Sequence, residues 1–273
     1  MQENIWRLID TGFSDAYFNM AVDEVLILSC KKDGAKPVLR FYQWNPSGLS
    51  LGYAQKFGDG FSLKNCRDMG IDVVRRITGG QAVFHDCDLT YSVAVPESYL
   101  EPPKTERLFK MISNGLMEGL KNLGFKVQPF ISETPPRERD EKAYNCFFNR
   151  SNYEIAIGGK KLAGSAQRRI SGALLQHGSV MLRIDYERMA KVYDDDSGKT
   201  EEKISEIKKN ITSLAENGEM TPDITDIKKA IIEGFKNLSG IKFIPEPLAP
   251  EELSEAKRLA EEKYLTKEWN EVK

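Results

Sequence analysis

Residues Cys146–Arg169 read CFFNRSNYEIAIGGKKLAGSAQRR, and they predict a β-hairpin. Gly158-Gly159 is a signal for a two-residue turn between two short strands. Strand alternation then predicts which residues face one another across the hairpin. The expected pairs are Ile157 with Lys160, Ala156 with Lys161, and Ile155 with Leu162.

Cys146 precedes this hairpin and Lys161 lies on its return strand. A nearby ammonium favours the thiolate, which is the reactive form of cysteine. If the two side chains meet, the pair is suited to acyl transfer through a thioester. Two plainer interpretations stay open, a buried unreactive cysteine and a lysine on a solvated strand face.

Small residues surround Lys161 in this pattern. Ala156, Lys161 and Ala163 are expected on one face of the hairpin, and Gly164 follows them. A packed core favours larger side chains, whereas alanine and glycine leave room for a ligand or a partner strand.

The stretch VVRRITGGQAVFHDCDLTYSV (Val73–Val93) holds a second glycine turn. Gly79-Gly80 allows a close approach of the backbone to a ligand, because no Cβ intervenes. Its N–H groups are suited to bind a carbonyl oxygen or a phosphate. Arg75 and Arg76 point to opposite faces of their strand, so at most one reaches such a site directly. A tight hairpin with surface arginines is the alternative, and no nucleotide fingerprint is present.

The only histidines, His85 and His177, each follow a glycine-containing motif. Either can orient a substrate or carry a proton, and either can be a hydrogen-bonded structural histidine. His85 and Cys87 have too few neighbours of ligand type for a zinc site, so we expect no metal.

The composition excludes several classes of protein. The 273 residues are 40% apolar and 29% charged, which is typical of a globular protein with one large domain. The net charge of −2 gives no support for bulk binding to nucleic acid or anionic membrane. The N-terminus lacks a secretory signal, no apolar run approaches the roughly 20 residues that span a bilayer, and the four cysteines lack C-x-x-C spacing. We therefore expect a cytoplasmic enzyme with reduced thiols.

Apolar periodicity predicts a mixture of helices and strands. The helices are expected near residues 15–29 (capped by Ser14), 61–69, 104–122, 186–193, 223–238 and 251–264. Besides the hairpin, strands are expected near 5–9, 38–42, 49–52, 73–76, 82–85, 89–95, 125–129, 174–182 and 241–244. Asp194–Asn210 reads as charged and loop-rich, and Ser132–Ala143 reads either as a lid or as a solvated linker. Without regular βαβ alternation, the expected class is α/β (mixed α+β). Residues 1–193 would form the catalytic domain, and 194–273 a C-terminal helical extension packed on it.

Four segments together resemble the lipoate–biotin protein ligase and transferase superfamily, and the resemblance covers nearly the whole chain. They are RRITGGQAVFHD (75–86), LTYSV (89–93), GKKLAGSAQRR (159–169) and LQHGSVML (175–182). ATP-dependent lipoate ligases carry an Arg-Asn-Asp type segment before the lysine hairpin. This chain has Cys146-Phe147 and Ser151-Asn152-Tyr153-Glu154 there, which is similar to octanoyltransferases of the LipM type. Ala163–Gln167 also departs from the Cys-Gly-Ile-Ala-Gln of related amidotransferases.

The resemblance implies a curved mixed sheet flanked by helices and an acyl-chain tunnel beside the glycine turn. It implies that Cys146 is the acyl-thioester nucleophile and that Lys161 lowers its pKa. The substrate-binding residues would be Arg75, Gly79, Gly80, His85, Ala163, Gly164 and Ser165.

The reaction implied is transfer of an octanoyl group from acyl carrier protein to a lysine of a lipoyl domain or of glycine cleavage H protein, with no cofactor. The local basic residues would suit docking of an acidic carrier or its pantetheine phosphate, or they merely solvate the surface. They are Arg150, Lys160, Lys161, Arg168 and Arg169. An ATP-dependent lipoate ligase, an amidotransferase acting between lipoyl domains, and a non-catalytic binding protein are the alternatives.

Overall fold

The computed structural model describes residues 4–32, 34–130, 154–170, 172–194 and 200–271. Cys146 and the segment Ser132–Ala143 therefore lie outside the described residues. The strands are β1 (Ile5–Ser14), β2 (Val38–Trp44), β3 (Gly48–Leu51), β4 (Asp72–Arg75), β5 (Val83–His85), β6 (Asp88–Pro96), β7 (Gln128–Pro129), β8 (Ile155–Ile157), β9 (Lys160–Ile170), β10 (Ala173–Met181) and β11 (Lys242–Pro245).

These strands form two sheets. The main sheet has the order β11-β1-β2-β6-β10-β9-β8-β7, and the small one has the order β4-β3-β5. β1 runs parallel to both of its neighbours, and the remaining pairs of the main sheet are antiparallel. The expected mixed α/β class with a large mixed sheet is confirmed.

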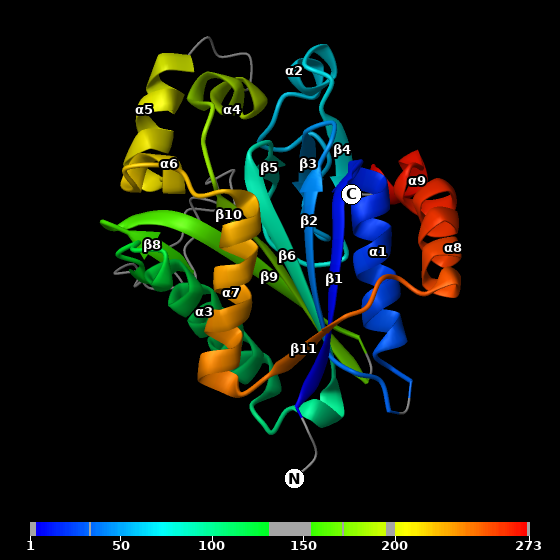
Figure 1. Ribbon diagram of the computed structural model, residues 1–273. Coiled ribbons are helices and arrows are strands. Elements are labelled where there is room, and N and C mark those ends of the chain that lie inside the picture. The colour runs from blue at the N-terminus through cyan, green and yellow to red at the C-terminus, as the bar shows by residue number, and fades with distance from the viewer. Residues whose placement is uncertain (1–3, 33, 131–153, 171, 195–199, 272–273) are drawn as a thin grey trace.

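Helices cover both faces of the main sheet. They are α1 (Ala16–Ser29), α2 (Leu63–Asp68), η1 (Glu97–Tyr99), α3 (Lys104–Asn122), α4 (Tyr186–Val192), α5 (Thr200–Asn210), α6 (Leu214–Asn217), α7 (Ile224–Ser239), α8 (Pro250–Leu259), η2 (Ala260–Tyr264) and α9 (Lys267–Asn270). Figure 1 shows α3 and α7 on one face and α1 and α8 on the other, with α2, α4 and α5 near the small sheet. Each helical layer closes an apolar core, and a third core lies between the small sheet and α4 and α5. Among the described residues, no helix is long and apolar enough to cross a membrane.

Most predicted elements are confirmed within a few residues, and α3 has the predicted bounds. Two predictions about helices are wrong. Asp15, not Ser14, caps α1, and its carboxylate accepts a hydrogen bond from the N–H of Phe18. Asp194–Asn210 is not loop-rich where the structure describes it, because α5 occupies Thr200–Asn210. The isoleucines of α5 recur on one face, and Ile207 is buried in the third core.

The hairpin of β8 and β9 has a bulge that the sequence did not reveal. Ile157–Lys160 and Ala156–Lys161 pair as predicted, but Ile155 pairs with Ala163 instead of Leu162. An extra residue in one strand shifts the alternation beyond it. As a result Ala163 turns into the apolar core on the α3 side, and Gly164 comes to lie against the side chain of Lys161.

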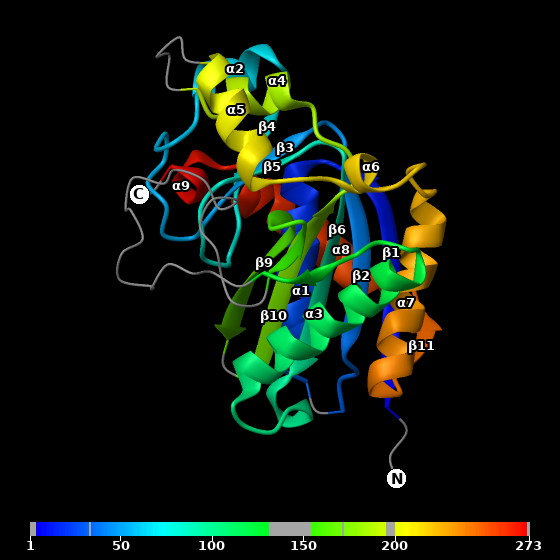
Figure 2. The same ribbon diagram turned by 90° about the vertical axis from the view of Figure 1, so that its left-hand side faces the viewer.

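The C-terminal residues are interwoven with the rest of the fold. β11 extends the main sheet beside β1, and the ammonium of Lys263 lies 2.6 Å from the Glu24 carboxylate of α1. Helices α3 and α7 approach very closely, since a Cβ added at Gly234 would lie 2.3 Å from the carbonyl oxygen of Gly115. Figure 2 shows these two helices side by side across the main sheet. The boundary at residue 193 stays a prediction.

Candidate active site

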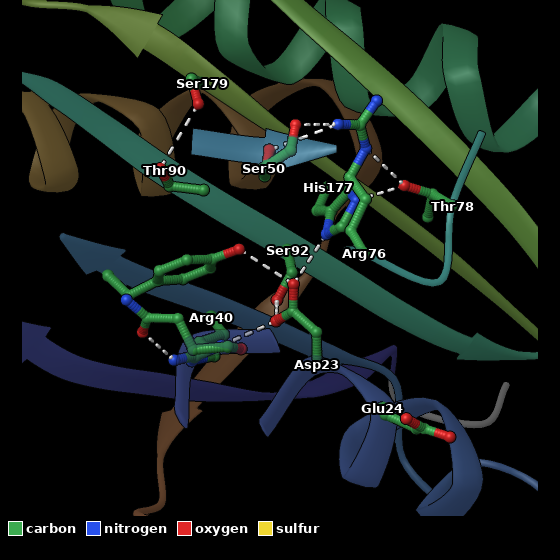
Figure 3. Close-up of polar contacts among 12 residues, drawn as sticks. Asp23, Glu24, Arg40, Ser50, Arg76, Thr78, Thr90, Ser92, His177 and Ser179 are labelled. Atoms are coloured by element: carbon green, nitrogen blue, oxygen red, sulfur yellow. Dashed lines mark hydrogen bonds and ion pairs between the residues drawn. The ribbon is translucent and has the colours of Figure 1, made fainter. Parts of the chain in front are cut away.

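A pocket opens between one face of the main sheet and the small sheet, and most of its exposed wall is apolar. Strands β9, β10, β6 and β2 contribute its floor, while α1 and the small sheet contribute its sides. The lining residues are Met20, Tyr42, Trp44, Ser50, Arg76, Val83, His85, Thr90, Lys161, Gly164, Ser165, Ala166, His177, Gly178 and Ser179. Figure 3 shows Ser50, Thr90, His177 and Ser179 in this region, contributed by both sheets.

Lys161 brings an ammonium into this pocket. Its Nζ lies 2.7 Å from Oε1 of Glu154, and the two residues are 2% and 5% exposed. A buried charge is stable only when it is paired and hydrogen-bonded, and this ion pair meets that requirement. The peptide backbone of Lys161 is fixed as well, because Thr212 donates its N–H to the Lys161 carbonyl at 2.9 Å. The pocket thus has a fixed cation in its wall.

A chain of hydrogen bonds connects α1 to the glycine turn (Figure 3). Asp23 Oδ2 lies 2.8 Å from Nδ1 of His177, and Nε2 of His177 lies 2.6 Å from the hydroxyl of Thr78. Burial lowers the pKa of His177, and although burial alone would raise the pKa of Asp23, hydrogen bonds from His177 and the charge of Arg40 lower it. A neutral imidazole has one donor and one acceptor nitrogen, so Nδ1 donates to the carboxylate and Nε2 accepts from Thr78. His177 is therefore a neutral, oriented group in the pocket wall.

His85 makes a second histidine–carboxylate pair. Its Nδ1 lies 3.0 Å from Asp88 Oδ2, and its Nε2 lies 2.9 Å from the hydroxyl of Ser50. The ring stacks on Trp44 with centroids 4.0 Å apart. The indole N–H of Trp44 in turn donates to Thr90 at 2.7 Å. These contacts hold the pocket wall rigid.

Arg76 fixes the glycine turn from inside. Its guanidinium donates to the carbonyls of Gly79 at 2.7 Å, Gln81 at 2.9 Å and Ser50 at 2.6 Å. The turn also packs closely, since a Cβ at Gly52 would lie 1.7 Å from the carbonyl oxygen of Gly80. Gly79 and Gly80 are themselves exposed and do not line the pocket.

The structure brings together four of the predicted site residues. Lys161, His85, Gly164 and Ser165 line one pocket. Cys146 lies outside the described residues, so its predicted role stays a prediction.

Four of the predicted substrate-binding residues do not line the pocket: the exposed Gly79 and Gly80, and also Ala163 and Arg75. Ala163 lies in the apolar core because of the hairpin bulge. The Arg75 guanidinium is buried away from the pocket, where it binds the carbonyls of Gly52, Gln55 and Asn270 and so holds α9. Of the two arginines, Arg76 is the one in the pocket wall.

Sequence reasoning missed Glu154 and Asp23. Asp23 lies among the apolar residues of the buried stripe of α1, and a carboxylate in such a stripe is a signal for a buried polar network. Glu154 precedes Ala156 by two residues, so strand alternation places it on the face of Lys161, and this is the signal that could have identified the pair.

The described cysteines offer no alternative nucleophile in the pocket. Burial raises the pKa of Cys30 and of Cys66 to about 12, so both thiols stay protonated. Cys87 is half-buried, and it does not line the pocket. In the described part of the chain, no group of three or more His, Cys, Asp or Glu side chains is placed to hold a metal ion.

Comparison with known proteins gives consistent matches. A family model described as the lipoyl protein ligase A/B catalytic domain matches residues 15–236. Octanoyltransferase LipM of Staphylococcus aureus (strain NCTC 8325 / PS 47) is 37% identical over 270 residues, covering 97% of each chain. Octanoyltransferase LipM of Bacillus subtilis (strain 168) is 37% identical over 275 residues, covering 99% of each chain.

Solved structures share the fold. One is a bi-partite lipoate protein ligase and its E2 lipoyl domain from Thermoplasma acidophilum, with a TM-score of 0.80 and 25% identity, covering 97% of this chain and 95% of that one. Another is lipoate-protein ligase A bound with ATP, with a TM-score of 0.79 and 25% identity, covering 99% of both chains.

Proposed function

Because the chain belongs to the lipoyl protein ligase A/B catalytic domain family, and within it to the octanoyltransferases named LipM, we propose that it transfers an octanoyl group to a lysine of an acceptor protein in lipoate biosynthesis. The donor is octanoyl acyl carrier protein, and the acceptor is a lipoyl domain or glycine cleavage H protein. The observation that carries the proposal is a buried, paired ammonium in the wall of a mostly apolar pocket. An apolar wall suits an acyl chain, and the cation suits the negative charge that develops during acyl transfer.

The proposed chemistry has two steps. The Cys146 thiolate attacks the octanoyl carbonyl, the carrier thiolate leaves and takes a proton, and an acyl-enzyme thioester forms. The acceptor lysine, as a neutral amine, then attacks the thioester, and its N–H proton goes to the leaving Cys146 sulfur as the amide forms. Exchange of one thioester for another is nearly balanced, and amide formation is downhill, so the reaction needs no ATP. Lys161 stabilises the thiolate in both steps.

Intact-protein mass spectrometry tests this proposal. Wild type incubated with octanoyl carrier protein should gain one octanoyl group, and acceptor protein should then remove it. Cys146→Ala should gain none, and Cys146→Ser should form no thioester. Full transfer by Cys146→Ala would eliminate the covalent mechanism.

The solved lipoate ligases of the same fold favour one specific rival, an ATP-dependent ligase. Its distinguishing result is modification of acceptor protein from free acid plus ATP, with Cys146 dispensable. An octanoylated lipoyl domain supplied as donor in a parallel reaction identifies an amidotransferase instead. Complex formation with no acyl-enzyme from any donor would leave only a binding protein. The cytoplasmic location expected from the sequence stays a prediction.

A further inference from the structure

Lys161 places its ammonium at a buried site, where the side chain is 2% exposed. A buried charge is stable only when it is paired and hydrogen-bonded. Glu154 is placed to pair with it, with its Oε1 at 2.7 Å from Nζ.

The backbone holds the two partners of this ion pair in place. The carbonyl of Glu154 accepts a hydrogen bond of 2.7 Å from the N–H of Phe130, and Ile155 pairs with Pro129. Lys161 pairs with Ala156 in the neighbouring strand. Both partners are therefore positioned by strand pairing before any substrate arrives.

Gly164 supplies the space for the ammonium. A Cβ added there would lie 2.6 Å from Cε of Lys161 and 3.8 Å from Oε1 of Glu154. The lysine side chain passes close to this glycine and reaches the carboxylate. Gly164 lies three residues after Lys161 on β9. The bulge between them brings the two residues to the same face of the strand.

We propose that Glu154 is a positioning residue that keeps Lys161 charged and fixed in the pocket wall, so that Lys161 acts in acyl transfer as a permanent cation and not as a base. This inference rests on the proposed function. The charged lysine has no lone pair with which to take a proton from the incoming amine. It stabilises the negative charge that develops on the reacting acyl group or leaving sulfur.

The pH dependence of Lys161 acetylation gives a direct test without any acyl donor. Trace acetic anhydride modifies a lysine only in its neutral form, and peptide mass spectrometry separates Lys161 from its exposed neighbour Lys160. In Glu154→Gln, loss of the carboxylate charge should lower the pH midpoint for Lys161 acetylation by about one unit or more. Lys160 is the internal control, and its midpoint should not change. Glu154→Asp keeps the charge and should stay near wild type.

Octanoyl transfer provides the second readout. In Glu154→Gln the alkaline limb of the pH–rate profile should move to lower pH by the same amount as the acetylation midpoint, and Glu154→Asp should restore it. If the pH midpoint for Lys161 acetylation were unchanged in a folded Glu154→Gln protein, the inference would be overturned. A pH–rate profile that does not shift with this midpoint would overturn it as well. Failure of wild type to transfer octanoate from any donor would instead reject the proposed function, because the acetylation result does not depend on it.

Discussion

The ammonium of Lys161 occupies the space in which a side chain at Gly164 would stand. A Cβ added at Gly164 would lie 2.8 Å from Nζ and 2.6 Å from Cε of this lysine, closer than real atoms approach. The glycine is therefore required by the position of a catalytic candidate and not by a turn. This relationship makes the two residues one functional unit.

Gly164→Ala should therefore reduce octanoyl transfer with little effect on folding. The atoms in conflict are the end of a flexible side chain, so the free energy of unfolding should change by less than about 1 kcal/mol. A displaced ammonium should reduce kcat/KM by about tenfold to a hundredfold. Urea unfolding and steady-state transfer measure the two effects. In a Lys161→Ala background, the same substitution should have no further effect on residual transfer, and a full additional loss there would contradict this explanation.

The sequence predicted the elements of the fold better than the partners within the site. The spacing of apolar residues is a local signal, which is why α3 has its predicted bounds. The choice between Arg75 and Arg76 depends on what packs on each face of β4, and α9, nearly 200 residues later in the chain, decides it by binding Arg75. The contact between Lys161 and Gly164 depends on a bulge, and no residue type in the hairpin marks a bulge reliably.

Replacement by glutamine should have different effects at Arg75 and at Arg76. Arg76→Gln leaves carbonyls of the glycine turn without their donor and changes the pocket wall, so transfer per folded molecule should fall at least about tenfold. Arg75→Gln loosens α9 and should cost about 1–3 kcal/mol of unfolding free energy. Its transfer rate per folded molecule should stay within about threefold of wild type.

Limited proteolysis distinguishes these two variants. Cleavage within residues 264–271 should accelerate in Arg75→Gln and stay at the wild-type rate in Arg76→Gln. If Arg75→Gln lost transfer while its C-terminal segment stayed protected, Arg75 would belong to the substrate site after all.

His177 should make folding stability sensitive to mild acid. Burial keeps its pKa below the usual value of about 6.5, so below that pH the unfolded chain binds a proton that the folded protein does not. Its contribution to stability is present above about pH 6.5 and is lost as the pH falls further. Asp23, whose pKa is also lowered, loses its contribution only below about pH 4, so the two residues act in separate pH ranges.

Urea unfolding from pH 7.5 to 5 measures this effect. The unfolding free energy of wild type should fall more steeply with acidification than that of His177→Gln, by up to about 1.4 kcal/mol per pH unit at the acidic end. Equal slopes in the two proteins would mean that His177 takes up a proton without unfolding. The hydrogen bond from its Nδ1 to Asp23 would then not require a neutral ring.

Alkylation of the cysteines tests whether Lys161 acts on Cys146. Removal of a nearby cation destabilises a thiolate, so Lys161→Ala should raise the pH midpoint for reaction of Cys146 with iodoacetamide. Cys87 is half-buried outside the pocket, and its midpoint in the same sample should stay unchanged. Cys30 and Cys66 should remain unmodified near neutral pH in the folded protein, because burial raises the pKa of each to about 12. Modification of Cys30 or Cys66 would reveal unfolding. If the pH midpoint for alkylation of Cys146 were the same in wild type and in folded Lys161→Ala, Lys161 would not act on the Cys146 thiol.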